Sequence, residues 1–307
     1  MRILRIEALA LVLLLLAAPV MATSTPPSPG EDLEYTLRFR GWVTGFIELN
    51  VAKLTLSVEP ELQDVEGTPA YVTRLRLTTE PFSKAELLYP VRLDYRSWLD
   101  ARLLEPILAT KSLHTDDAER ELFWFDRTAR TGYRYASGPG DEAQGDPAPP
   151  PSRLQPITAL PETTWSSLRA RGQMDFEESG VLDYMGLLQQ LRYRPLQPGE
   201  WYDFRVFTGK KLEHYRVQVA KERLVRAGWD RPAYHLKLFE FDPKKQRLKD
   251  EINLWLSDDP QRVLLRFYAE RTIGALEGIL ETGRPENGRH EKLQESTRRS
   301  LETYLGF

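Results

Sequence analysis

Apolar and polar residues alternate with a period of two along much of the first half of the chain. Because successive side chains of a strand point to opposite faces, such runs predict half-buried strands. Gly41 and Gly45 separate the first two runs and predict the turn of a first hairpin, since glycine tolerates positive φ. Strands roughly ten residues apart predict an antiparallel meander. The runs cover 33–42, 46–51, 71–78, 91–99, 107–114 and 119–126.

The second half carries the same strand signature with one interruption. Between 175 and 194 the apolar residues recur at helical spacing before Pro195, which predicts one short amphipathic helix near 178–192. The predicted fold class is therefore all-β or β-dominated, a curved antiparallel sheet or partly closed β-barrel with that helix. The further strands are predicted at 201–207 and 212–219, which flank the turn Gly209-Lys210-Lys211, and at 233–241, 250–256 and 263–270.

The first 22 residues have the pattern of a signal peptide. Arg2 and Arg5 precede an apolar run over 8–20, and small residues follow at 20–22. The run of about 13 residues falls short of the roughly 20 that cross a membrane as a helix, so an uncleaved anchor is the alternative reading. The pattern predicts export into the periplasm of a bacterial-type envelope.

A single β domain is predicted over 33–282, after a proline-rich lead at 23–32. A proline-rich insertion at 137–161 contains Pro149-Pro150-Pro151, and its composition cannot bury enough apolar area to offset chain entropy. It is predicted as an exposed loop, with a cap over a cavity mouth as the alternative. The tail at 283–307 is polar with weak helical spacing and is predicted as a solvated or loosely docked helix.

Composition narrows the chemistry of the chain. It contains no cysteine, which excludes disulfides, thiolate metal sites and cysteine nucleophiles. A net charge of −3 gives no basic field, so neither nucleic acid nor an anionic membrane surface is implied as a partner.

The polar residues offer few candidate catalytic or metal-binding motifs. None of the four histidines has the spacing of metal ligands. Asp258-Asp259-Pro260 lies between two predicted strands and predicts a tight turn, with calcium binding as the alternative. The chain has no Gly-x-Ser-x-Gly elbow and no glycine-rich phosphate loop before a helix. The sequence thus predicts no metal, no cofactor and no catalytic residue.

Aromatic residues gather in the predicted strands. In the run Phe123-Trp124-Phe125, at least one ring must lie on the sheet face opposite the other two. A curled sheet has room for an apolar ligand on its concave side, and the alternative is core packing with cross-strand pairs. The ligand-binding residues predicted on this basis are Trp42, Phe123, Trp124, Phe125, Trp201 and Trp255.

Three segments together resemble one protein family. They are Tyr35-Thr-Leu-Arg-Phe-Arg-Gly41, Leu187-Leu-Gln-Gln-Leu-Arg192 running on into Pro198-Gly199, and Leu254-Trp-Leu-Ser-Asp258-Asp259. They resemble the exported bacterial proteins of domain-of-unknown-function family 3108, over roughly 33–282. The resemblance implies a signal peptide, a β-rich envelope protein and no assigned activity. It transfers no catalytic residue, and the insertion and tail depart from its compact pattern.

These observations leave three classes of function. The first is a non-catalytic periplasmic binding or carrier module for an apolar or amphipathic envelope molecule such as a lipid. The second is an interaction or assembly factor that engages an envelope protein through sheet edges and the proline-rich insertion. A hydrolase of envelope glycans or lipids is the least supported, because no catalytic motif was found. A carrier predicts an apolar cavity, and an assembly factor predicts a filled interior with an exposed apolar patch.

Overall fold

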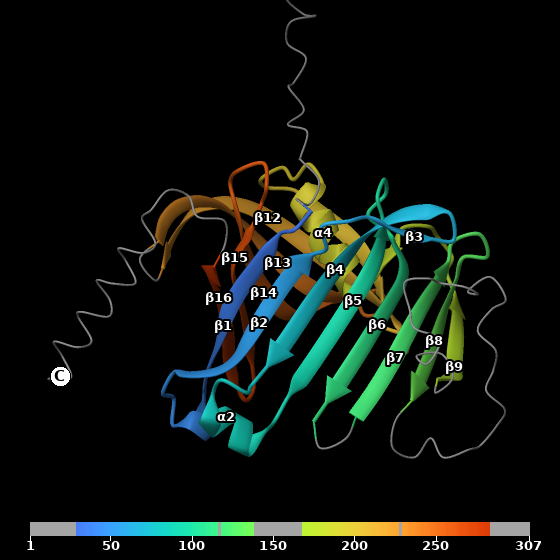
Figure 1. Cartoon of the computed structure of the whole chain (residues 1–307). Helices are drawn as coiled ribbons and strands as arrows, with labels where there is room; N and C mark the ends of the chain where they lie inside the picture. Colours follow the sequence, from blue (N-terminus) through green and yellow to red (C-terminus); the bar gives the residue numbers. More distant parts are fainter. Residues whose placement is uncertain (1–28, 116–117, 138–167, 227–228, 283–307) are drawn as a thin grey trace, which may run out of the picture.

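The computed structural model describes residues 29–115, 118–137, 168–226 and 229–282. Most of them form one curled, almost entirely antiparallel sheet of 16 strands (Figure 1). The hydrogen-bonded order is β10-β11-β12-β13-β14-β15-β16-β1-β2-β4-β5-β6-β7-β8-β9, and β3 pairs with β4 off this path. In the described chain β10 and β9 each have one strand neighbour, so the sheet does not close. The prediction of a β-dominated, curved antiparallel sheet is confirmed.

The elements follow one another in a meander. The first part of the chain contains β1 (Asp32–Gly41), the short 3-10 helix η1 (Trp42–Thr44), β2 (Leu49–Val58), β3 (Gln63–Val65), β4 (Thr68–Thr78), α2 (Ser83–Leu88), β5 (Arg92–Asp100), β6 (Pro106–His114), β7 (Ala118–Asp126), β8 (Thr131–Ser137) and β9 (Arg169–Asp175). The second part contains β10 (Val181–Leu182), α4 (Tyr184–Tyr193), β11 (Trp201–Phe207), β12 (Leu212–Arg226), β13 (Trp229–Asp242), β14 (Arg247–Ser257), β15 (Leu264–Arg271) and β16 (Gly274–Thr282).

Each alternating run of the sequence overlaps a strand, and the predicted turns lie between strands. The run at 46–51 was placed too early, because Phe46 has a positive φ of 64° in the turn and β2 begins only at Leu49. Gly45 ends η1 with a φ of 61°, so the turn between β1 and β2 is confirmed. Gly209 turns the β11–β12 hairpin with a φ of 82°, and a Cβ there would lie 2.2 Å from a ring carbon of Phe123. Glycine at this position therefore lets the hairpin pack directly against β7. The sequence did not predict β3, β8, β9, β10, β16 or α2.

Helix α4 lies inside the curved sheet rather than on its outer surface. Seven of the ten residues of α4 are buried. Of the other three, only Tyr184 is exposed. A helix on an outer face would bury a single stripe. Its contacts are with β4, β5, β10 and β11, and each buried leucine such as Leu191 contributes roughly 1.5–3 kcal/mol.

Two predictions about helices need correction. The predicted helix begins at Tyr184 rather than near residue 178, because residues 181–182 form β10, which pairs in parallel with β11. The expectation of a single helix within the β domain was wrong, since α2 is a second one. The predicted signal peptide, residues 23–28 of the lead, residues 138–161 of the insertion and the predicted C-terminal helix lie outside the described residues.

The sheet carries a core on each face. On the concave face, β1, β2, β7 and β11 to β15 pack together with α4. On the convex face a smaller core gathers around Trp98, Leu122 and Trp124, and β3 contributes Val65 to it. Trp98 also donates its indole N–H to the Gln63 side chain at 2.9 Å, which fastens β3 over this core. Both faces of the sheet are covered at β7, which explains why its apolar residues follow one another without alternation.

Candidate ligand-binding surface

The start of α4 is fixed by a buried carboxylate. Asp183 is fully buried, and its side chain accepts the backbone N–H of Gly186 at 2.6 Å as the N-cap of the helix. Its other oxygen accepts the hydroxyl of Tyr95, from β5, at 3.0 Å. Burial raises the pKa of the Asp183 carboxyl above its usual range, and the hydrogen bonds only partly offset this effect.

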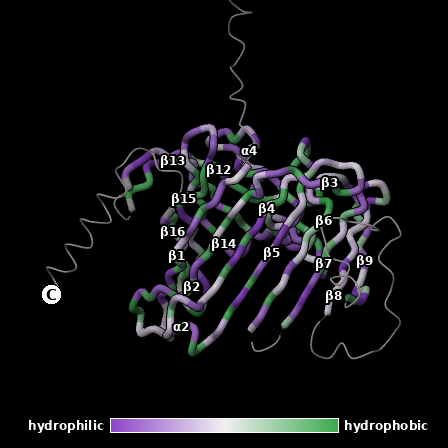
Figure 2. The backbone as a smooth tube through the Cα atoms, viewed as in Figure 1, coloured by the Kyte–Doolittle hydropathy of each residue, from purple (hydrophilic) through white to green (hydrophobic). Residues whose placement is uncertain are grey.

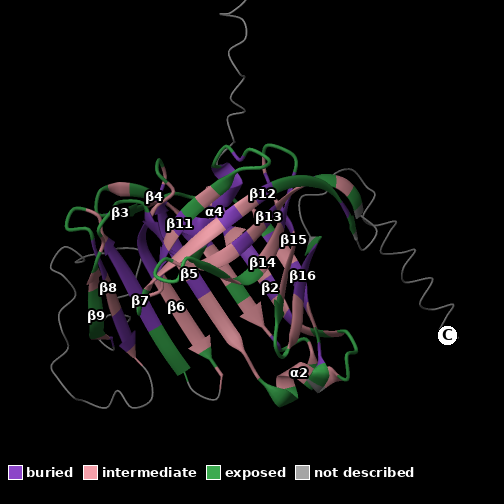
Figure 3. Cartoon of the chain, turned by 180° about the vertical axis from the view of Figure 1, so that it is seen from behind, coloured by how far each residue is buried: buried purple, intermediate pink, exposed green. Residues whose placement is uncertain are grey.

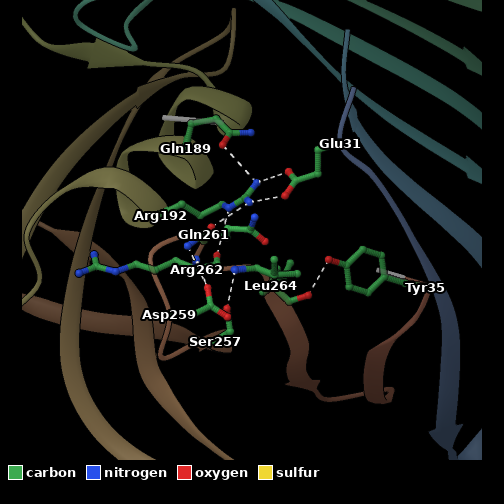
Figure 4. Close-up of polar contacts among 10 residues, drawn as sticks. Glu31, Tyr35, Gln189, Arg192, Ser257, Asp259, Gln261, Arg262 and Leu264 are labelled. Atoms are coloured by element: carbon green, nitrogen blue, oxygen red, sulfur yellow. Dashed lines mark hydrogen bonds and ion pairs between the residues drawn. The ribbon is translucent and has the colours of Figure 1, made fainter. Parts of the chain in front are cut away.

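The end of α4 is fixed by a buried guanidinium (Figure 4). Arg192 is only 3% exposed and makes a two-pronged ion pair with Glu31, with both N–O distances at 2.7 Å. It also donates to the backbone carbonyls of Gln261 and Arg262, each at 3.1 Å. Burial lowers the pKa of Arg192, but the hydrogen bonds to Glu31 and the nearby negative charge together outweigh burial and raise it overall. One side chain therefore joins α4 to the start of β1 and to the β14–β15 turn.

The turn that receives Arg192 is the Asp-Asp-Pro segment. The Asp259 carboxylate accepts the backbone N–H groups of Gln261 and Arg262 at 2.9 and 3.0 Å, so the predicted tight turn is confirmed. The Ser257 hydroxyl accepts the N–H of Val263 at 2.8 Å. Together, α4, Glu31 and the turn 257–263 form what we call the capped end of the sheet.

Below α4 the concave face is only partly covered. Leu77, Leu93 and Leu113 stand directly opposite one another across β4, β5 and β6. They lie on the concave face because Leu93 is two residues from Tyr95, whose hydroxyl reaches Asp183 at the start of α4. All three leucines are half-buried, whereas core side chains level with α4 are buried. We call these three residues the leucine row.

A polar cluster adjoins the leucine row on the same face. Glu121 is buried and accepts hydrogen bonds from Lys111 at 2.7 Å and from Arg134 at 2.5 and 2.8 Å. Lys111 stands opposite Tyr95 and therefore also lies on the concave face. Burial raises the pKa of Glu121, but the two cations outweigh burial and hold it below its usual range. The cluster places two cations around one carboxylate beside an apolar surface.

The opposite end of the sheet from α4 exposes large apolar side chains. The β1–β2 turn, α2 and the β15–β16 turn meet there (Figure 1), with Gly41 beside the Ile273 carbonyl. Hydrophobic stretches occur at this end in Figure 2, and α2 and the neighbouring turns are coloured exposed and intermediate in Figure 3. The exposed side chains, which we call the apolar end, are Trp42 (65%), Phe46 (71%), Ile47 (64%), Leu87 (86%), Leu88 (79%), Tyr89 (65%) and Ile273 (59%).

The aromatic triplet divides between the two faces, as predicted. Phe123 and Phe125 lie on the concave face, where both pack edge to face on Phe207 with ring centroids 6.4 and 5.7 Å apart. Phe176 packs on the same ring at 5.5 Å. Trp124 belongs to the convex core. On the concave face, the rings of Phe123, Phe125 and Phe176 therefore fill the interior around Phe207.

The three other predicted ligand-binding residues have surroundings that differ from those of the triplet. Trp42 belongs to the apolar end, and Trp201 is half exposed on β11. Trp255 is buried between His235, stacked at 4.5 Å, and Arg266, at 4.2 Å from the ring centroid. Its indole N–H is donated to Glu222 at 2.6 Å. The structure therefore brings together Phe123 and Phe125 but not the six predicted residues as a set.

A small cavity lies beside Phe125 and Phe176. Its volume is about 50 Å³, and Arg127, Arg130 and Glu178 contribute to its lining. This space fits water rather than an acyl chain. Among the described residues, no group of three or more histidine, aspartate or glutamate side chains is placed to hold a metal ion. Likewise, no helix in the described ranges has the length and apolar character to cross a membrane.

The sequence reasoning missed the leucine row and most of the apolar end. Leu77, Leu93 and Leu113 come from three different strands, and only their register brings them together. A signal for α2 was present in Leu87-Leu88-Tyr89, where three large apolar residues precede Pro90 outside any alternating run. Such a run off the strand pattern indicates an exposed apolar site.

A family model described as "Protein of unknown function (DUF3108)" matches residues 164–281. The resemblance to DUF3108 is confirmed over this segment. The DUF3108 match includes α4, Arg192 and the turn of the capped end, whereas η1 and α2 lie outside it.

A solved structure also resembles this chain. The crystal structure of a beta-barrel-like protein of domain of unknown function DUF1849 from Brucella abortus aligns with a TM-score of 0.49 and 9% sequence identity, and the alignment covers 83% of this chain and 97% of that one. No curated protein matches the chain.

Proposed function

We propose that this protein is a non-catalytic periplasmic binding or carrier module for an apolar or amphipathic molecule of the cell envelope. The observation that supports this most is the leucine row, Leu77, Leu93 and Leu113, which leaves a half-exposed apolar surface inside a curved sheet. Apolar concave surfaces with a few convergent polar groups are typical of small-molecule sites. The predicted signal peptide supports the compartment.

The polar cluster favours an amphipathic ligand over a purely apolar one. Lys111 and Arg134 surround Glu121 on the face that carries the leucine row. An acyl chain on the leucines would leave its polar group within reach of the two cations, where charge-assisted hydrogen bonds are available. The aromatic triplet takes no part in this proposal, because Phe123 and Phe125 are packed on Phe207.

Mass spectrometry is the first test of this proposal. The mature protein is purified without detergent from the envelope fraction of its own host, then measured by native mass spectrometry and by organic extraction. We expect a stoichiometric lipid-like molecule that is absent from the Leu93→Glu and Leu113→Glu variants. A buried charge on the row disfavours an apolar ligand strongly.

A matched control separates ligand loss from unfolding. Leu62 is a half-exposed leucine before β3, away from the row, so Leu62→Glu should keep the bound molecule. All three variants are compared by circular dichroism and thermal melting. A clean apo mass for the wild-type protein, or equal ligand content in all folded variants, would refute the carrier proposal and favour an interaction factor.

A further inference from the structure

A third cation faces the polar cluster from β9, the last strand on this side of the sheet (Figure 1). Arg169 on β9 stands opposite Ala136 on β8, and Ala136 stands opposite Glu121 on β7. Residues directly opposite one another share a face of the sheet, so Arg169 lies on the concave face with Glu121. Neighbouring strands are about 4.8 Å apart. Only the methyl group of Ala136 therefore stands between Arg169 and the cluster in this row.

The Arg169 guanidinium lacks an acceptor. Its Nη1 is shielded from solvent and makes no hydrogen bond, and Arg169 forms no ion pair among the described residues. A shielded donor without an acceptor is costly, and more so when it belongs to a charged group. The fold thus holds a charged donor on the concave face that an oxygen atom of a ligand would satisfy.

The two other cations also keep donors that the fold does not use. In the described chain Lys111 donates one hydrogen bond and Arg134 donates two, and all three go to Glu121. An ammonium carries three N–H groups and a guanidinium carries five. One carboxylate is therefore shared by two cations in direct contact with it, and Arg169 adds a third cation in the same row.

The other carboxylates of this neighbourhood do not satisfy the three cations. Glu119 is exposed and stands opposite Leu113, at the end of the leucine row. Beyond the tip of the β11–β12 hairpin, Glu213 and Glu240 lie 2.9 and 4.0 Å from the Lys211 ammonium. In the part of the chain that the structure describes, none of these carboxylates forms an ion pair with a cation of the cluster or with Arg169. The unused N–H groups therefore remain available to a ligand.

We propose that Lys111, Arg134 and Arg169 bind the anionic headgroup, a carboxylate or a phosphate, of an amphiphile whose chain lies on the leucine row. This inference rests on the proposed function and narrows it to one charge class of ligand. Leu113 is two residues from Lys111 on β6, so the apolar and cationic surfaces adjoin on one face. Anionic oxygens accept charge-assisted hydrogen bonds from ammonium and guanidinium groups, whereas a neutral headgroup accepts weaker ones and a cationic headgroup none.

Calorimetric titration of the mature protein with matched amphiphiles tests this assignment. Decanoate and decyl phosphate carry anionic headgroups on the same chain, decanol carries a neutral one and decyltrimethylammonium a cationic one. We expect the better of the two anions to bind at least about tenfold more tightly than decanol, and the cation to bind most weakly. Which anion binds more tightly distinguishes a carboxylate from a phosphate headgroup.

A variant of Arg169 tests the third cation. Arg169→Gln should weaken the binding of the preferred anion about tenfold and leave the binding of decanol unchanged. The matched control is Arg120→Gln, which removes an exposed arginine from the opposite face of β7 and should change neither affinity. Circular dichroism and thermal melting show whether both variants fold like the wild type.

The outcomes separate this inference from the carrier proposal. Equal affinity of the wild type for both anions and decanol would overturn the inference and leave the carrier proposal standing. A folded Arg169→Gln variant that binds the anion like the wild type would overturn the role of Arg169. Failure of every amphiphile to bind would refute the carrier proposal itself. The comparison of headgroups needs only the wild type, so it decides the inference whether or not Arg169→Gln folds.

Discussion

The two ends of the sheet differ in how far the protein encloses their side chains. At the capped end, Arg192, Glu31 and Asp183 satisfy their hydrogen-bonding groups within the protein and are nearly or fully buried. At the apolar end, the side chains of Trp42 and Leu87 are largely uncovered and lie in water. Interactions closed within the fold stabilise it, and groups left open are available to something outside it. The comparison predicts that changes at the capped end alter folding, whereas changes at the apolar end leave folding almost unaltered.

The largest effect is expected at Arg192. The Arg192→Met variant leaves the Glu31 carboxylate unpaired and two carbonyls of the turn without their donor. Removal of one partner of a buried ion pair costs about 3–5 kcal/mol of the free energy of unfolding. Urea denaturation followed by tryptophan fluorescence measures this cost.

A double-mutant cycle provides the control for Arg192. Glu31→Gln alone and together with Arg192→Met gives the coupling between the two charges. We expect the double variant to be clearly more stable than the sum of the single costs predicts. A cost below about 1 kcal/mol for Arg192→Met would mean that the capped end does not depend on this pair.

An intermediate effect is expected at Asp183. The Asp183→Ala variant removes the N-cap of α4 and should cost about 1–2 kcal/mol, whereas Asp183→Asn keeps an acceptor for the Gly186 N–H and should cost less. Because the pKa of Asp183 is raised in the folded protein, its contribution to stability is complete below the unfolded pKa of about 3.9 and is lost as pH rises through the folded pKa.

The pH dependence of the Asp183 variants follows from the upward shift of the Asp183 pKa in the folded protein. The stability of Asp183→Asn relative to the wild type should increase as pH rises from about 4 towards 7. Thermal melts at several pH values check the trend. A constant difference across this range would show that Asp183 titrates alike in the folded and unfolded states.

The smallest effect on folding is expected at the apolar end. Leu87→Ser/Leu88→Ser should change the free energy of unfolding by less than about 0.5 kcal/mol for each residue, since both side chains are largely in water already. Chemical denaturation beside the Arg192 variant measures the contrast directly. A loss comparable to that of Arg192→Met would mean that α2 belongs to the folding core.

The alternation of the sequence predicted strands wherever one face is buried and the other is half exposed. β1 is such a case, with Leu33, Tyr35 and Leu37 buried at every second position. In β2 only residues 49–51 were predicted, although its buried residues alternate from Ala52 to Val58. β9 offers no such contrast, because most of its residues are exposed, and it was not predicted. α2 was also missed, since it has six residues, none of them buried, and no side-chain cap.

The candidate surface was harder to predict than the fold. The division of Phe123-Trp124-Phe125 between two faces follows from the geometry of any strand, and the structure confirms it. The leucine row depends on the register of three strands, which no single segment encodes.

The position of β1 sets the order in which this sheet can be completed. Most strands pair with a neighbour in sequence, but β1 also pairs with β16, where Tyr35 stands opposite Leu280. That pairing closes the longest loop in the chain, so its entropic cost favours late formation. Until β16 arrives, one edge of β1 is an open template for other strands. A chain shortened by β16 would present two such edges, on β1 and β15, and should aggregate during folding.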